Sequence, residues 1–369
     1  MRIGFDARMV EWSGVGRYSR NLLRALSEVA PDNDYVLFCN QDGAQSLPEG
    51  GTFERVFVNL EVFKFSSLFS LSGPLRRAKL DLFHSPHFVS PITKSCPVVN
   101  TIHDLIPLAV PAAMPSYLSR LRYRRLNKWA LSRADAVIAV SNFTKGQILE
   151  RFKVDPERLF VIPEAADPAL AEYVDAGELA PIKRRHGISG DYLLAFGHTK
   201  AHKNTSGLIK AFAGVKSRAA EGEQLQLVLM GDERLARRFK PLITELGLTG
   251  ADLVIVPFLE DRALAAVYRG AAAFIMPSLM EGFGLPVLEA MACGVPVICS
   301  NQASLPEVAD GAAAMFDPFD PADMENVISG VLADKERRLE LAALGSARAK
   351  TFSWERTAKA TLKVYERLL

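Results

Sequence analysis

The sequence predicts an α/β protein built from two doubly wound domains, each containing a parallel β-sheet. Three observations lead to this fold class. The chain has 369 residues, about the length of two ordinary domains. Short apolar runs that favour strands alternate with amphipathic helical stretches almost throughout, as is typical of parallel sheets covered by helices. This alternation is interrupted once, by a segment that contains Pro168 and Gly177.

The first domain is expected to span residues 1–172. Its predicted strands cover residues 3–7, 35–39, 55–60, 80–85, 98–103, 136–141 and 159–163. Helical periodicity predicts helices between several of them, at 16–29, 116–132 and 142–152. The segment 166–180 is interpreted as the linker because proline and glycine interrupt the pattern there.

The second domain is expected over residues 180–353. Its predicted strands cover residues 192–197, 225–231, 253–258, 273–277, 296–300 and 313–316, and its predicted helices include 205–216, 285–293, 321–332 and 335–350. A last helix at 354–369 is expected to pack back on the first domain. Because doubly wound sheets bind ligands at the carboxyl ends of their strands, we expect the two domains to face each other across a ligand-binding cleft.

Composition excludes several classes of protein. A formal net charge of +2 gives no electrostatic sign of a nucleic-acid partner. The four cysteines include no CxxC pair, which indicates buried, reduced thiols. No apolar leader is visible, and no apolar run approaches the roughly 18 to 20 residues that a membrane span needs. We therefore expect a cytoplasmic protein, with peripheral attachment to the inner face of the plasma membrane as a further hypothesis.

The strongest motif is EGFGLPVLE at residues 281–289, which follows an apolar strand and opens a helix. Gly282 and Gly284 allow a tight turn and close approach to a ligand, and Pro286 suits a first helical turn. Amide groups at a helix start bind phosphate well. The expected diphosphate site comprises Gly282, Phe283, Gly284 and Leu285.

Two carboxylates flank this expected diphosphate site. Glu289 lies one turn inside the helix, and because helical side chains lean toward the amino end it is predicted to accept hydrogen bonds from ribose hydroxyls. Glu281 precedes the helix and is predicted to bind hydroxyls of a transferred sugar. The structural alternative is a Gly-rich turn followed by an amphipathic helix with two surface glutamates. The coincidence of strand, glycines and helix-starting proline favours the ligand site.

The pattern Glu281-x7-Glu289, within EGFGLPVLEAMACGVPVICS, resembles the signature of glycosyltransferase family 4. The motifs SGVGRY at 13–18, HDLIP at 103–107, VS at 140–141, GHTKAHKN at 197–204 and LPE at 305–307 occur in the family's order, so the resemblance extends over nearly the whole chain. It implies a GT-B enzyme with two Rossmann-like domains. It also implies transfer of a hexose from a nucleotide-diphosphate sugar with retention at the anomeric carbon.

The resemblance further implies the substrates. The acceptor would be a glycan or a lipid-linked molecule bound by the first domain, in the synthesis of envelope polysaccharide, such as lipopolysaccharide, or of glycolipid. The favoured donor is GDP-mannose, with UDP-glucose, ADP-glucose and other UDP-sugars left open. No cofactor is implied, and no His, Cys or Asp cluster in the sequence has metal-ligand spacing.

The same resemblance assigns roles to two further residues. His103 ends a strand and is implied as an active-site contact in the transition state, since no side-chain nucleophile is generally agreed for retaining GT-B enzymes. Asp104 is expected only to orient His103. A strand-end histidine with a purely structural role is the alternative.

Lys203 matches the family's phosphate-binding lysine and would stabilise the negative charge that develops on the departing diphosphate. His202 and His198 stand where relatives often have arginine. We therefore expect leaving-group stabilisation to be pH-sensitive near neutrality. A solvated loop with ordinary cations is the alternative.

Two further groups of residues complete the site: Gly14 and Gly16 are assigned to donor binding, and Ser141 and Glu307 are weaker assignments. Gly14 and Gly16 form a Gly-containing loop before a helix, suited to an anionic group. The incomplete Gly fingerprint disfavours a dinucleotide site and hence an NAD-dependent oxidoreductase. Ser141 is carried over as a residue facing the cleft, and Glu307 as one near the donor base or ribose.

A basic, acid-free stretch at 117–133 with interleaved aromatic residues suggests a helix that lies on an anionic membrane. Apolar residues at helical spacing nearby extend this hypothesis: Val62, Phe65, Leu68 and Phe69. A solvated basic face is the alternative. Two other functions stay open for the whole chain: a non-catalytic sugar-nucleotide-binding protein, and a GT-B epimerase or phosphorylase.

Overall fold

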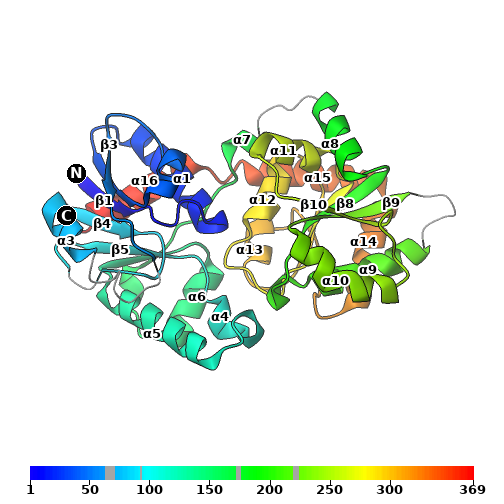
Figure 1. Ribbon diagram of the computed structural model, residues 1–369, viewed down its shortest axis with the longest axis horizontal. Helices are drawn as coiled ribbons and strands as arrows, with labels where there is room; N and C mark the ends of the chain where they lie inside the picture. Colours follow the sequence, from blue (N-terminus) through cyan, green and yellow to red (C-terminus); the bar gives the residue numbers. More distant parts are fainter. Residues whose placement is uncertain (63–70, 92–93, 172–175, 219–223) are drawn as a thin grey trace. The chain divides into compact units, whose positions relative to one another are not determined.

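The computed structural model describes residues 1–62, 71–91, 94–171, 176–218 and 224–369. They form two compact units (Figure 1). Unit 1 comprises residues 1–165 and 352–369, and unit 2 comprises residues 166–351. The segment expected as the linker therefore starts inside unit 2, where the short helix α7 (Pro168–Ala171) contacts helices α11 and α12. Part of it, residues 172–175, lies outside the described residues.

Unit 1 contains a seven-stranded sheet in the order β3-β2-β1-β4-β5-β6-β7, with every neighbouring pair parallel. Its strands are β1 Arg2–Asp6, β2 Asp34–Cys39, β3 Phe53–Phe57, β4 Leu82–Ser85, β5 Val98–Ile102, β6 Ala136–Ala139 and β7 Leu159–Val161. The strand order reverses between β1 and β4, where doubly wound sheets place their ligand sites. Its α-helices are α1 Ser13–Val29, α3 Ser72–Ala78, α4 Ile106–Ala109, α5 Tyr117–Arg133, α6 Asn142–Arg151 and α16 Trp354–Glu366.

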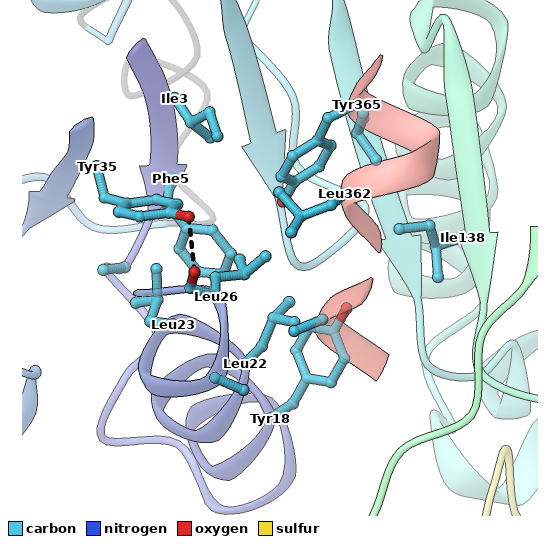
Figure 2. Packing of buried hydrophobic residues seen from close by; sticks show 14 of the residues in the cluster. Ile3, Phe5, Tyr18, Leu22, Leu23, Leu26, Tyr35, Ile138, Leu362 and Tyr365 are labelled. Atoms are coloured by element: carbon cyan, nitrogen blue, oxygen red, sulfur yellow. Dashed lines mark hydrogen bonds between the residues drawn. The ribbon is translucent and has the colours of Figure 1, made fainter. Parts of the chain in front are cut away.

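The two faces of this sheet bury different clusters because successive strand residues point to opposite sides. One face packs against α1 and α16, as the labelled residues in Figure 2 show, and the hydroxyl of Tyr35 donates to the carbonyl of Leu26 across this core. The strand residues that point to the other face pack with α5 and α6 in a second cluster, which includes Ile102, Tyr123 and Ile148. The chain thus returns from unit 2 to complete the core of unit 1 with α16.

Unit 2 contains a six-stranded parallel sheet in the order β10-β9-β8-β11-β12-β13. Its strands are β8 Asp191–Phe196, β9 Leu225–Met230, β10 Leu253–Val256, β11 Ala273–Met276, β12 Val297–Ser300 and β13 Ala314–Phe316. Its remaining α-helices are α8 Leu179–His186, α9 Thr205–Arg218, α10 Glu233–Glu245, α11 Asp261–Arg269, α12 Leu285–Ala292, α13 Leu305–Ala309, α14 Pro321–Ala333 and α15 Lys335–Ala349. Helices α9, α10 and α14 contribute to the main buried cluster of this unit.

The predicted fold class is confirmed: each of the thirteen predicted strands has its counterpart, in two parallel sheets. The largest displacement is in β3, which starts at Phe53 and not at residue 55. The helix expected from residue 16 begins at Ser13, so Gly14 and Gly16 lie within its first turn and not in a loop before it.

Candidate active site

The turn before α12 is built around Gly284. Its φ of 112° is in the region that favours glycine, and a Cβ atom there would lie 2.7 Å from Leu305 Cδ2. Pro286 lies in the first turn of α12, as predicted. The buried hydroxyl of Ser304 anchors the turn by donating to the carbonyls of Phe283 at 2.7 Å and Glu281 at 3.0 Å. The sequence carried no local sign of Ser304, because it lies about twenty residues downstream of the turn.

Lys203 and Glu281 form an ion pair. The ammonium Nζ of Lys203 lies 2.7 Å and 3.0 Å from the two carboxylate oxygens of Glu281. Lys203 ends a short 3₁₀ turn, η5 Ala201–Lys203, after β8, and Asn204 follows in the left-handed conformation. The two residues that the motifs predicted for phosphate and sugar binding are therefore adjacent, although they are 78 positions apart in sequence.

Glu289 is buried, with 2% of the residue exposed. The hydroxyl of Tyr268 on α11 donates to its Oε2 at 3.1 Å. This carboxylate is therefore oriented by a residue that the sequence analysis did not identify. A role in holding ribose hydroxyls stays a prediction, and it requires that the carboxylate keep an accepting position beside Tyr268.

The expectation of pH sensitivity near neutrality from His202 and His198 is wrong. His202 is buried, and burial with the neighbouring positive charge of Lys203 lowers its pKa to about 4. Burial and Lys200 also lower the pKa of His198, whose Nδ1 accepts a hydrogen bond from the Lys200 amide. Burial and the neighbouring lysines thus favour neutral side chains for both histidines, and the positive charge of this segment lies on Lys200, which is exposed, and on Lys203, which pairs with Glu281.

Glu307 lies on the short helix α13, which follows the Ser304 anchor. Its carbonyl accepts a hydrogen bond from Arg348 Nη2 at 2.8 Å, and the same guanidinium also binds the carbonyl of Val308. The segment is thus tied to α15, and the assignment of Glu307 to the base or ribose stays a prediction.

In unit 1, polar side chains gather where β4, β5, β6 and β7 end. The ring of His103, after β5, has Nδ1 2.7 Å from Glu164 Oε1 and Nε2 3.0 Å from the carbonyl of Pro86. The edge of the Tyr18 ring lies against it, with centroids 4.8 Å apart. Although burial alone lowers the pKa of His103, the hydrogen bond and charge of Glu164 raise it above the ordinary value.

The orienting role that the resemblance gave to Asp104 is filled by Glu164. The Asp104 side chain instead accepts the amide of Ile106 at 3.0 Å, at the start of α4. Ser141 is fully buried and caps α6 by accepting the amide of Thr144 at 3.0 Å. Thr144 in turn donates to the carbonyl of His103. Ser141 therefore supports the strand-end histidine from the neighbouring helix.

Gly16 is required by the backbone, because a Cβ atom there would lie 2.1 Å from the carbonyl oxygen of Val10. Gly14 is exposed and its added Cβ would meet nothing within 4 Å, so its predicted anion contact stays untested.

Unit 1 also contains a buried polar cluster that the sequence analysis missed, formed by Asp6, Arg8 and His87. Arg8 binds both carboxylate oxygens of Asp6, at 2.6 and 2.8 Å, and His87 Nε2 lies 3.2 Å from Asp6. Burial alone would raise the pKa of Asp6, but Arg8 and His87 hold it well below its usual range. His87 Nδ1 accepts the amide of Val89, which fixes the loop after β4.

Among the described residues, no group of three or more His, Cys, Asp or Glu side chains is arranged to hold a metal ion. Within the same part of the chain, no helix combines the length and apolar character required to cross a bilayer.

Comparison with known proteins identifies the family. Residues 181–347 match the model described as glycosyl transferases group 1, and residues 12–170 match the model described as glycosyltransferase family 4. The chain is 27% identical over 388 residues to the O-antigen chain mannosyltransferase B of Escherichia coli, with 100% of both chains covered. It is 30% identical over 308 residues to the D-inositol 3-phosphate glycosyltransferase of Salinispora arenicola, covering 77% of this chain and 68% of that protein.

Among solved structures, the sucrose-phosphate synthase of Thermosynechococcus elongatus superposes with a TM-score of 0.81 at 21% identity, covering 100% of this chain and 99% of that chain. This likeness supports the GT-B fold alone. The family models and the inositol-phosphate enzyme together show that the chain belongs to glycosyltransferase family 4, with a group 1 glycosyltransferase domain within unit 2.

Proposed function

We propose that this chain is a retaining glycosyltransferase that moves a hexose from a nucleotide-diphosphate sugar to a glycan or lipid-linked acceptor. Mannose is the favoured sugar and GDP-mannose the favoured donor, because the full-length relative from Escherichia coli is named a mannosyltransferase. That relative's name also favours a role in envelope polysaccharide synthesis.

The observation that carries this proposal is the Lys203–Glu281 pair beside the α12 turn. When the bond between the anomeric carbon and the diphosphate breaks, negative charge develops on the leaving phosphate. In the proposal Lys203 and the first amides of α12 stabilise that charge, since fixed donors stabilise a transition state more than its ground state. For this, the donor phosphate replaces Glu281 as the partner of Lys203 when the donor binds. The Glu281 carboxylate is then free to accept hydrogen bonds from sugar hydroxyls.

The test is turnover with a panel of nucleotide sugars. Thermal-shift measurements first rank GDP-mannose, UDP-glucose and ADP-glucose as ligands, and the best donor is then incubated with glycan and lipid-linked acceptors. The one-bond C1–H1 coupling of the new linkage reports its configuration, and the proposal expects the α configuration of the donor to be kept. An inverted product would contradict the retaining mechanism, and donor binding without turnover would favour a non-catalytic protein.

Metal independence is part of the same proposal. A lysine and a helix amino end can together neutralise a diphosphate without a divalent ion. Transfer is therefore expected to persist in excess chelator. Loss of transfer that magnesium restores would contradict this part of the proposal.

A second proposal concerns an anionic membrane surface. Helix α5 buries Tyr123, Asn127, Ala130 and Leu131 and exposes most of its basic residues together with Tyr117 and Leu118, of which 69% and 74% are exposed. Basic residues beside an exposed apolar pair fit an anionic lipid surface, to which each contributes about 1 kcal/mol. Val62 is buried against Met9 and does not extend this surface, whereas Phe65, Leu68 and Phe69 lie outside the described residues.

Vesicle sedimentation tests this surface with a matched pair of variants. Arg124→Glu/Arg125→Glu reverses two exposed charges on α5, and Arg184→Glu/Arg185→Glu reverses two exposed charges on α8. We expect salt-sensitive binding to vesicles with anionic lipid, weakened about 10-fold or more by the α5 variant only. Equal weakening by both variants, or no binding at low salt, would exclude a specific membrane surface on α5.

A further inference from the structure

The ring of His103 is held between two hydrogen-bond acceptors. Nδ1 lies 2.7 Å from a carboxylate oxygen of Glu164, and Nε2 lies 3.0 Å from the main-chain carbonyl of Pro86. A carbonyl and an ionised carboxylate accept hydrogen bonds and cannot donate them. Both contacts are therefore satisfied only when both ring nitrogens carry protons, which is the imidazolium form.

The fold fixes both acceptors from separate elements. The carbonyl of Pro163, which immediately precedes Glu164, accepts the hydroxyl of Thr357 on α16 at 2.8 Å. Glu164 itself is 4% exposed. The helix that returns to unit 1 at the end of the chain thus holds the segment that presents this carboxylate.

The Pro86 carbonyl belongs to a loop that is equally constrained. The side chain of Asn100 donates to the carbonyl of His87 at 2.8 Å, and Ser85 donates to the carbonyl of Val89 at 2.8 Å. Because polar side chains fix the loop on both sides of Pro86, its carbonyl stays directed at the His103 ring.

The charged and titratable groups around His103 favour the cation. Glu164 after β7 and the adjacent Asp104 are acidic, Tyr18 on α1 presents a ring edge, and two neutral histidines, His84 and His87, lie at β4 and in its loop. The pKa of His103 is raised, whereas burial lowers that of each of the other five histidines: His84, His87, His186, His198 and His202.

We propose that Glu164 is a positioning residue that keeps His103 as an imidazolium, so that His103 acts as a fixed cation and not as a base. The use of His103 in sugar transfer rests on the proposed function, whereas the protonation state of His103 does not. Because 18% of the His103 side chain is exposed, it remains partly accessible to a ligand.

Histidine-ring NMR of the full-length protein tests the protonation state without any substrate. Across a pH titration of the wild type, the His103 ring is expected to retain both N–H protons above pH 6.5, the ordinary pKa of histidine. A wild-type pKa below that value, or a ring with one proton at pH 6.5, would overturn the proposal. This measurement requires no variant and so does not depend on whether any variant folds.

Glu164→Gln supplies the second test, because it keeps the shape of the side chain and removes its charge. The pKa of His103 is expected to fall by about one unit or more, and Glu164→Asp to recover part of the difference. The matched control is Glu54→Gln, on the surface of unit 1, whose carboxylate pairs with Arg2 at 2.6 Å. An unchanged His103 pKa in folded Glu164→Gln would overturn the role of Glu164.

Transfer kinetics then separate this role from the proposed function. If the imidazolium is used, kcat falls as pH rises through the pKa of His103, and the midpoint moves to lower pH in Glu164→Gln. A shifted ring pKa with an unshifted kcat profile would sustain the positioning role and reject the use of His103 in transfer.

Discussion

Each unit places histidines where its strands end, and His103 of unit 1 differs in character from His198 and His202 of unit 2. In unit 2, His198 and His202 lie near Lys200 and Lys203, and burial together with these positive charges keeps them neutral. In unit 1, the His103 side chain is 18% exposed, and Glu164, 2.7 Å from its ring, raises its pKa. Burial lowers the pKa of all three of these histidines, and only the carboxylate beside His103 brings its pKa above the ordinary value. In the candidate site of unit 2 the positive charge is on Lys203, whereas in unit 1 it is on His103, which is paired with the carboxylate of Glu164.

Removing the ammonium group of Lys203 has the largest expected effect. Lys203→Ala is predicted to lower kcat about 10²- to 10³-fold, the usual loss when one fixed transition-state donor is removed. Steady-state kinetics measure it, with the exposed Lys200→Ala as the matched control. If both variants kept wild-type kcat, the assignment of the leaving-group charge to Lys203 would fail.

Glu289→Gln addresses the carboxylate that the predicted ribose contacts require. Hydrogen bonds to a charged group are worth about 1.5–3 kcal/mol, so donor affinity is expected to fall about 10- to 100-fold with a smaller change in kcat. Titration calorimetry with the nucleotide diphosphate measures the change. Tyr268→Phe, which removes only the hydroxyl that orients Glu289, is expected to weaken binding less. An unchanged affinity in Glu289→Gln would contradict the ribose assignment.

The buried, neutral side chain of His202 predicts that the free energy of unfolding depends on pH. The pKa of His202 is about 4 in the folded protein against 6.5 in the unfolded chain, so the unfolded state binds the extra proton first. Through His202 alone, the free energy of unfolding is therefore highest above pH 6.5 and decreases as the pH falls toward 4. The decrease is about 2 kcal/mol between pH 7 and pH 5. Denaturant unfolding at these two pH values should show a smaller loss for His202→Gln than for the wild type. His84, whose pKa is about 3, makes a similar contribution in unit 1 that this variant leaves in place. Equal losses in both proteins would reject the buried neutral state of His202.

A pair of glycine variants tests the turn geometry. Gly284→Ala introduces strain at a φ of 112° and a contact of 2.7 Å with Leu305, and it should destabilise the protein by about 1–3 kcal/mol. Gly311→Ala is the matched control, because its φ of 81° carries similar strain but its added Cβ would meet nothing within 4 Å. Equal unfolding free energies for the two variants would show that packing against Leu305 does not restrict the turn.

How much could be predicted depends on whether a feature is local in the sequence. The α12 turn is encoded by contiguous residues, so glycine, proline and glutamate spacing identify it from the sequence. Strands and most long helices were equally visible, because their apolar periodicity is local. The residues that orient the site were not: Glu164 is 61 positions from His103, Ser304 is 21 from Phe283, and Tyr268 is 21 from Glu289. Such contacts depend on tertiary packing, as do the depressed pKa values of His198 and His202.

The most direct test of the central claim is hydrogen-exchange mass spectrometry with and without a saturating nucleotide diphosphate, GDP or UDP, whichever gives the larger thermal shift. If the amides that start α12 bind the diphosphate beside Lys203, exchange should slow in the peptides that cover residues 198–205 and 281–289. Protection confined to other segments, with these two unchanged, would contradict the claim.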